Sequence, residues 1–418
     1  MRIRQYDDNS DLVAKLLLFI FSPFLSFLCS LSRPGSKSSY IIYFLFGIVF
    51  AWHMDSRNPN HYDDFLGIVE RFKATNYSTQ EMINCLINFF SFSEDAPKEI
   101  FEIVLIWFSK LIADNYHIYF ALASIFYLLF MLKSMKFITS DKKFQGGFWG
   151  VLIMALFYLP RDIITIQNPR FVVGFWFNVM CTLIYFFDDK KTKYIYALLI
   201  VLSPIFHSGM WFYVGAFLFC VLFISLFKND KFYIILFYLT IPFSFLSYEV
   251  LSQFDFSVLP LPSKLSQSIN IYLSDETYST YIKQSGKSGF WWVQAIFDWL
   301  TILSYSLIPL FVIRKRTSCI VLRQDISFFR YFLLFCSIVN FIQTIPVLGF
   351  RYYYFFRVFA IIVWFKYVFP RHNKYLLFIL LACSFSLFMR YFYNGAVSVC
   401  VPPGIWWEPL PWLIFDGL

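Results

Sequence analysis

The sequence predicts an all-α polytopic membrane protein with about twelve transmembrane helices, and three observations support this prediction. First, the 418 residues are 59% hydrophobic and only 15% charged, whereas soluble domains carry about 25% charged residues. Second, long apolar runs recur along the chain, and a helix needs roughly 20 apolar residues to cross a bilayer core. Third, these runs are continuous rather than alternating, which is the pattern of buried or lipid-facing helices.

Apolar segments along the chain are expected to form these helices. The segments are 12–31, 38–54, 116–133, 144–160, 168–187, 194–206, 208–227, 232–250, 289–313, 326–348, 353–369 and 375–393. The first segment lacks the small-residue cleavage site of a secretory signal, so it is interpreted as a retained helix that crosses the membrane or lies in its interface. Residues 1–418 are expected to form a single integral membrane domain.

The polar joints between these segments predict the orientation of the chain. One set is short and basic, such as "DDKKTK" (188–193) and "RKRTSCIVLR" (314–323), and is expected on the cytoplasmic side by the positive-inside rule. The other set is mixed in charge and is expected on the outer side, with the loop 252–288 and the tail 394–418. The same rule explains most of the net charge of +9, which therefore does not indicate nucleic-acid binding.

The first outer loop contains a predicted surface helix. The stretch "PKEIFEIVLIWFSKLIADN" (97–115) carries apolar residues at helical spacing, which is typical of an amphipathic helix. Glu99, Glu102 and Lys110 argue against a thirteenth span. The segment is expected to lie along the outer membrane surface, and the outer loop extends over about 55–115.

Four arginines lie at or near helix ends on the predicted outer side, where positive charge is disfavoured. They are Arg161, Arg170, Arg351 and Arg357. Ionisable groups at membrane depth are costly and usually functional, and the arginine fork pairs bidentately with phosphate. Arg170 also follows Pro169 near a helix N-terminus, which favours an anion. The alternative for each arginine alone is snorkelling to headgroups or pairing with an acidic neighbour.

His207 lies in "SPIFHSGMW" (203–211), within an apolar run of 34 residues from Tyr194 to Phe227. As helix that run spans about 51 Å, which is less than the roughly 60 Å of two crossings. The turn is therefore expected to stop at the level of the outer headgroups, where irregular backbone is buried in protein or faces water. A near-neutral base at that depth suits proton transfer, and the alternative is a histidine that only caps a helix break.

The order of these motifs resembles the EpsG and Wzy polysaccharide polymerases of bacteria over residues 12–415. "DSRNPNHYDDFLGIVERF" is similar to that family's motif of an arginine, an aspartate and spaced aromatics, with Asp64 at the aspartate. "NPRFVVGFWF" matches an arginine that opens a span, at Arg170. "SPIFHSGMWF" matches a histidine between two spans, at His207, and "RYYYFFR" resembles a late arginine–tyrosine segment, at Arg351.

This resemblance implies an integral membrane glycosyltransferase of the GT-C type in the bacterial inner (cytoplasmic) membrane, with its active site facing the periplasm. Such an enzyme would join oligosaccharide repeat units carried on undecaprenyl diphosphate, by inverting transfer and without a metal or other cofactor. The implied partners are undecaprenyl-diphosphate-linked oligosaccharide, membrane lipid and a chain-length regulator, and they do not include nucleic acid.

The reaction needs a base or an oriented hydrogen bond for the acceptor hydroxyl and cationic donors for the diphosphate leaving group. The candidates for the first task are His207, Asp64 and Asp63. The candidates for the second are Arg170, Arg351, Arg357 and Arg161. Further candidates for contacts with the substrate are Arg57 and Tyr352.

Two other functional classes remain open. An O-antigen ligase or another lipid-carrier transferase would work on the same face with the same carrier. A flippase for lipid-linked oligosaccharides would also need a basic cavity, but transporters commonly contain repeats and broken helices at the midplane. The sequence shows no repeat of fixed period, and its charges cluster on one predicted face, which favours the polymerase.

Overall fold

A computed structural model describes most of the chain. The described residues are 8–54, 64–91, 93, 96–97, 99–139, 168–188, 192–245, 303, 306–310, 325–343, 345, 348–368 and 403–416. Within these ranges every regular element is helical, which confirms the all-α class. The chain divides into two compact units, Met1–Val214 with Phe388–Leu418 and Gly215–Leu387.

The first unit begins with three helices, α1 (Asp8–Phe21), α2 (Pro23–Leu31) and α3 (Lys37–Trp52). The prediction of one helix over 12–31 is wrong, because the chain breaks at Ser22. The Ser22 hydroxyl accepts a hydrogen bond from the Leu25 backbone N–H at 3.3 Å, and Pro23 occupies the first helical position. Both features start a new helix, so this segment forms two helices too short to cross a bilayer singly.

A buried lysine ties α1 to α3. Lys15 Nζ lies 2.7 Å from Asp11 Oδ2, 2.9 Å from Ser38 Oγ and 3.0 Å from Ser39 Oγ. Lys15 is only 7% exposed, and a buried ammonium is tolerated when it is paired and hydrogen-bonded. The serine-rich start of α3 therefore provides the polar partners that let α1 bury a charge.

Two helices of the first unit, α7 (Tyr116–Thr139) and α9 (Pro169–Phe187), are long and apolar enough to cross a membrane. They match the predicted spans 116–133 and 168–187. α7 packs against α3 on one side and α9 on another. The approach to α3 is close at Gly47, where a Cβ would meet Leu128 Cδ1 at 2.6 Å.

The predicted break near His207 is present. α10 (Lys193–Val201) is followed by a 3-10 turn, η3 (Ser203–Ile205), and α11 begins after the turn (Met210–Leu226). Pro204 lies within this 3-10 turn. In a continuous α-helix its missing N–H would leave one backbone hydrogen bond unmade, and the turn avoids this loss. The described pieces Lys193–Ile205 and Met210–Leu226 are apolar but shorter than a full crossing.

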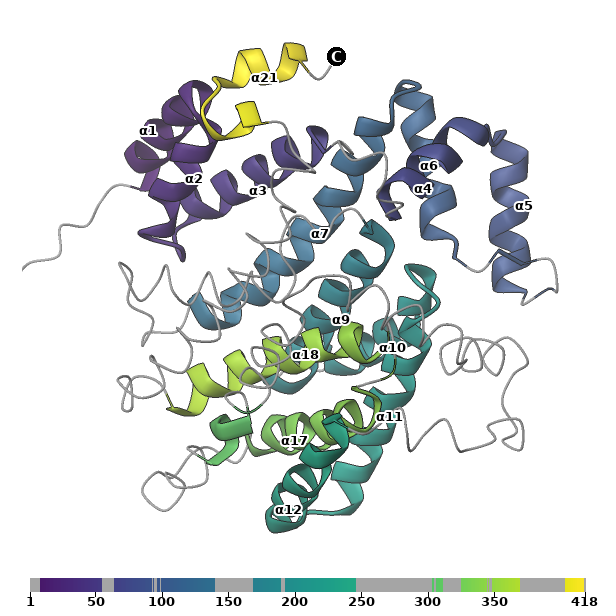
Figure 1. Ribbon diagram of the computed structural model, residues 1–418, viewed down its shortest axis with the longest axis vertical. Helices are drawn as coiled ribbons and strands as arrows, with labels where there is room; N and C mark the ends of the chain where they lie inside the picture. Colours follow the sequence, from purple (N-terminus) through teal and green to yellow (C-terminus); the bar gives the residue numbers. More distant parts are fainter. Residues whose placement is uncertain are drawn as a thin grey trace, which may run out of the picture. The chain divides into compact units, whose positions relative to one another are not determined.

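The predicted outer loop contains three helices, α4 (Asp64–Ala74), α5 (Thr79–Phe90) and α6 (Phe101–Ile112), which Figure 1 shows as a group beside the end of α7. α6 confirms the helix expected within 97–115. α5 begins with a capping box, in which the Ser78 hydroxyl accepts from the Glu81 N–H and the Glu81 carboxylate accepts from the Ser78 N–H. This box fixes where the α4–α5 connection ends.

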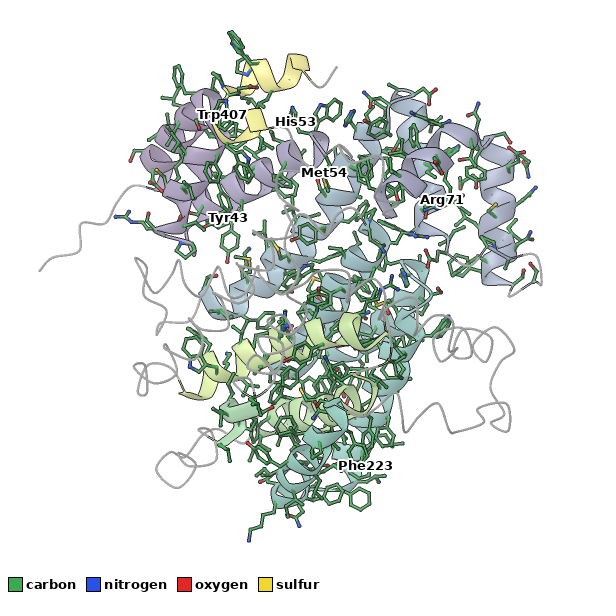
Figure 2. The ribbon with its side chains drawn as sticks, viewed as in Figure 1. Tyr43, His53, Met54, Arg71, Phe223 and Trp407 are labelled. Carbon is green, nitrogen blue, oxygen red and sulfur yellow. The ribbon has the colours of Figure 1, made fainter. Side chains whose placement is uncertain are left out.

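The C-terminal segment packs on the N-terminal helices, as Figure 1 shows for α21 (Leu410–Asp416) above α1 and α2. Before it, η7 (Pro403–Trp406) places the Trp406 ring 4.9 Å from the Phe24 ring, edge to face. His53 at the end of α3 lies with Nε2 2.5 Å from the Leu413 carbonyl oxygen. Figure 2 shows His53 and Trp407 at this end of the unit. The first and last described segments of the chain thus share one core.

The second unit is built on α12 (Asp230–Thr240), η4 (Ile241–Phe245), α17 (Asp325–Ile342), α18 (Leu348–Val363) and the π-helical turn η6 (Trp364–Val368). α17 packs against both α12 and α18. Arg330 on α17 reaches the start of α12, with Nε 2.5 Å from Asp230 Oδ1 and Nη2 2.7 Å from the Lys228 carbonyl oxygen. This ion pair anchors α12 where its N-terminal dipole also favours the Asp230 carboxylate.

The count of twelve spans is not confirmed, because only α7 and α9 meet the length and composition of a crossing among the described residues. The predicted spans 144–160 and 375–393 lie outside the described residues, and 289–313 lies mostly outside them. In the second unit, α12 with η4, α17, and α18 with η6 overlap the predicted spans 232–250, 326–348 and 353–369.

Candidate functional site

The structure brings two of the predicted site residues together in the first unit, Arg170 and His207. They are 37 positions apart in the sequence and meet through a third residue, Glu99, which precedes α6. The side chains of the other candidates in this unit lie outside the described residues. Arg57, Asp63 and Arg161 lie outside the described residues, and Asp64 begins α4 with its side chain outside them.

Arg170 stands in the first turn of α9. Pro169 occupies the first helical position, as the sequence predicts. The Asn168 side-chain oxygen, which accepts from the Phe171 N–H at 3.4 Å, caps the helix. Arg170 Nη1 lies 2.8 Å from Glu99 Oε2 and 2.9 Å from Glu102 Oε2. The guanidinium therefore bridges two carboxylates, one before α6 and one in its first turn.

Glu99 also holds the turn that carries His207. The Ser208 N–H and the Ser208 hydroxyl each donate to Glu99 Oε1 at 3.2 Å. His207 Nε2 lies 3.7 Å from the same oxygen. One carboxylate thus joins the start of α9 to the break between α10 and α11, and the side chain of Glu99 is 10% exposed.

The His207 ring is engaged by its own turn. The Gly209 N–H donates to His207 Nδ1 at 2.8 Å, so Nδ1 acts as an acceptor and a neutral ring carries its proton on Nε2. The ring also packs edge to face on Phe171, with centroids 5.4 Å apart. This geometry favours the capping alternative for His207, because Nδ1 holds the turn and Nε2–H faces Glu99.

Arg71 of α4 completes the ionic network. Its Nε lies 2.6 Å from Glu102 Oε1, with the Arg71 side chain 47% exposed and the Glu102 side chain 8% exposed. Figure 2 shows Arg71 among the helices α4 to α6. Each Glu102 oxygen therefore pairs with a different arginine, Oε1 with Arg71 and Oε2 with Arg170.

A cavity of about 280 Å³ opens beside this network. Its lining includes Arg71, Tyr77, Glu99, Glu102, Ile106 and Arg170. Burial, and then the charges of Cys85, Glu102 and Glu81, raise the pKa of Tyr77. The phenol is therefore protonated at neutral pH and can donate a hydrogen bond. The network and cavity together join α4, the α4–α5 connection, α6 and the start of α9.

The remaining predicted candidates lie in the second unit, on α18. Arg357 is 2% exposed, and its guanidinium lies over the Tyr353 ring at 4.6 Å from the centroid and near the Tyr354 ring at 5.9 Å. Tyr352 is buried and stacks on Phe355, with centroids 5.7 Å apart. Arg351, one turn from Phe355, is partly exposed. Their role with a diphosphate stays a prediction from the sequence.

Sequence reasoning missed Glu99, Glu102, Arg71 and Tyr77 as site residues. In the sequence the two glutamates indicate only that the segment 97–115 does not cross the membrane. Their spacing of three residues places them close together at the start of the helix. Nothing in the sequence near Arg71 and Tyr77 indicates a site, because they come close to α6 only through the packing of α4 and the α4–α5 connection. Among the described residues, no group of three or more His, Cys, Asp and Glu side chains could hold a metal ion.

In comparisons with known proteins, no family model, no curated protein and no solved structure matches this chain.

Proposed function

We propose that the chain is a membrane glycosyltransferase that joins oligosaccharide repeat units carried on undecaprenyl diphosphate. The observation that carries this proposal is the meeting of Arg170 and His207 at Glu99. These two residues come from separate stretches, and both match motifs of the polysaccharide polymerases that the sequence resembles. If the two motifs form one site, their residues are expected to share a contact beside a cavity, as Arg170 and His207 do through Glu99.

The proposed reaction is an inverting displacement. The acceptor hydroxyl oxygen attacks the anomeric carbon of the donor sugar, the bond from that carbon to the diphosphate oxygen breaks, and its electron pair leaves with the diphosphate. The hydroxyl proton needs an acceptor. Glu99 and Glu102 line the cavity, and a carboxylate oxygen accepts more than one hydrogen bond. Glu102 has one partner on each oxygen, so it is the better placed of the two to receive the proton.

His207 has a supporting role in this proposal. Its Nδ1 is held by the Gly209 N–H, so it shapes the turn that presents Ser208 to Glu99. Arg170 orients both carboxylates through Nη1. Cationic donors are needed for the charge on the leaving diphosphate, and the sequence predicts Arg161, Arg351 and Arg357 for this role.

The proposed setting is the bacterial inner membrane, with about twelve spans in a GT-C-like arrangement and the site on the periplasmic side. Two helices of crossing length, α7 and α9, support a membrane location. Exposed apolar side chains on α11 also support it, among them Leu218, Phe219 and Leu222, which are 47%, 50% and 61% exposed. Exposed residues of that size suit contact with lipid chains.

The test is complementation in a host strain that lacks the gene for this chain. Wild-type protein is expected to restore a ladder of polysaccharide, whereas Glu102→Gln and Arg170→Lys are expected to yield single repeat units at equal protein level. Arg330→Lys, an ion-pair change in the second unit that leaves the cavity intact, serves as the matched control. Ladders of normal length from Glu102→Gln would refute the proposed site, and the absence of a ladder with wild-type protein would refute the function.

A further inference from the structure

We infer that the cavity beside the Arg71–Glu102–Arg170–Glu99 network is a binding subsite for a single uncharged sugar ring. This inference rests on the proposed function for the identity of the sugar, which would be the non-reducing end of the acceptor unit. In this role Arg170 orients the two carboxylates instead of holding the diphosphate, the role that the sequence predicts for it.

The charges of the cavity favour a neutral ligand. Among the described lining residues two guanidiniums, Arg71 and Arg170, face two carboxylates, Glu99 and Glu102, and each arginine is already within 2.9 Å of a carboxylate oxygen. A diphosphate entering here would meet both carboxylates, and like charges at short range repel each other. A neutral polyol meets no such repulsion.

The hydrogen-bonding groups suit sugar hydroxyls, which donate and accept at once. Each Glu102 oxygen is paired with one arginine among the described residues, which leaves both oxygens able to accept from hydroxyl groups. Arg71, with 47% of its side chain exposed, and the protonated Tyr77 phenol provide donors. Arginine–carboxylate pairs fix the direction of these groups before a ligand arrives, which lowers the entropy lost on binding.

The volume and the apolar wall of the cavity limit the ligand to a single sugar ring. About 280 Å³ is at the small end of ligand pockets, which typically hold about 300–1,000 Å³, so one ring fits rather than an oligosaccharide. Ile103 and Ile106 form an apolar wall, which suits the C–H face of a pyranose. Tyr77, which lines the cavity, directly precedes the N-cap Ser78 of α5.

The experiment measures binding by calorimetry to the purified full chain in lipid nanodiscs. The probe is the repeat-unit oligosaccharide of the source strain, released from its lipid by mild acid so that it carries no diphosphate. Saturable binding to the wild-type chain is expected, with no competition from inorganic diphosphate. Tyr77→Phe, which removes one hydroxyl, is expected to weaken binding about three- to tenfold, and Glu102→Gln by more.

Asp114→Asn is the matched control for Glu102→Gln. It removes the same charge just beyond the end of α6, from a carboxylate that is 81% exposed and is not among the described residues that line the cavity, and binding is expected to equal wild type. Tyr77→Phe keeps the test intact if Glu102→Gln does not fold. No binding of the released saccharide, unchanged binding in Tyr77→Phe, or displacement by inorganic diphosphate would each overturn the inference.

The two proposals fail in different ways. Saccharide binding that depends on Tyr77 and Glu102, without any polymer formed from lipid-linked units, would refute the polymerase and support the sugar subsite. The opposite result is polymer formation from lipid-linked units together with saccharide binding that does not depend on Tyr77 and Glu102. It would refute the subsite and support the polymerase.

Discussion

Arg170 Nη1 lies 2.8 Å from Glu99 Oε2, and this ion pair joins the start of α9 to the segment before α6. Through Ser208 the same glutamate holds the break between α10 and α11. The start of α9, the segment before α6 and the break between α10 and α11 therefore meet at one carboxylate.

Glu99→Gln is expected to loosen this junction. The amide keeps one oxygen but brings an NH₂ group toward either the Arg170 guanidinium or the Ser208 donors, so at least one contact is lost. Hydrogen bonds to charged groups contribute about 1.5–3 kcal/mol, and the 21% exposure of the Arg170 side chain places the loss at the lower end, about 1–2 kcal/mol. The measurement is thermal unfolding in detergent with and without the substitution.

The control for Glu99→Gln is Asp114→Asn. It removes a carboxylate that is 81% exposed and lies 3.5 Å from Lys110 Nζ at the end of α6. Surface ion pairs of this kind contribute about 0–1 kcal/mol, so its unfolding temperature is expected to match wild type. Equal effects of the two substitutions would show that Glu99 is no more than a surface charge.

His207→Asn and His207→Gln separate the two roles of the ring. The Asn side-chain oxygen reaches the position of Nδ1 and can accept from the Gly209 N–H, whereas the Gln amide lies at the position of Nε2. Because Nδ1 holds the turn, Asn is expected to keep most of the polymerising activity and Gln to lose it. The measurement is the rate of ladder formation with purified variants across pH 6–8. An inactive, folded Asn variant would assign proton transfer to His207 instead.

Ser78→Ala is expected to fray the start of α5 and to release Tyr77. Loss of an N-cap serine costs about 1 kcal/mol, which corresponds to roughly fivefold faster amide exchange in the first turn of α5 if exchange follows local opening. Hydrogen exchange read by mass spectrometry checks this result. Unaltered exchange in 79–82 would mean that packing, rather than the capping box, holds the helix start.

Acid is expected to weaken the same cap. The hydrogen bond from the Ser78 backbone N–H, followed by that from the Ser78 hydroxyl, lowers the pKa of Glu81. A carboxyl whose pKa is lowered by folding stabilises the fold above its unfolded pKa of about 4.3, and this contribution is lost as pH falls through the folded value. Exchange in the first turn of α5, corrected for its intrinsic pH dependence, should rise below about pH 4 in wild type and not in Glu81→Gln.

Arg351→Lys tests the diphosphate role predicted for α18. If a planar fork is needed, retaining the positive charge alone is not enough, and the variant is expected to lose polymer as fully as Arg351→Ala. The measurement is the polysaccharide ladder at matched protein level. Full rescue by lysine would show that Arg351 supplies charge without directional pairing.

Much of the helical framework follows from the sequence. The spans 116–133 and 168–187 correspond to α7 and α9 because continuous apolar runs with a proline or asparagine start are strong local signals. The break around His207 also follows from counting residues against bilayer thickness. The division of 12–31 at Ser22 was not predicted, because Pro23 stands within an unbroken apolar run and its effect depends on the local cap.

The candidate site is predictable only in part. Arg170 and His207 stand out as polar residues at helix breaks, which single-sequence reasoning detects. Arg71 and Tyr77 become site residues only because α4 and the α4–α5 connection pack beside α6, and such tertiary contacts leave no trace in local periodicity. Glu99 and Glu102 are recognisable in the sequence as charges on a predicted amphipathic helix. Their ion-pair partners are not, because Arg170 is 71 residues from Glu99 and Arg71 is 31 residues from Glu102.

The polymerase function is tested most directly by incubating the purified chain with undecaprenyl-diphosphate-linked repeat units, in parallel with and without EDTA. We expect a ladder spaced by one repeat unit, equal in both reactions, with undecaprenyl diphosphate released in step with the bonds formed. Unchanged single repeat units, or a ladder that EDTA abolishes, would contradict a metal-independent polymerase.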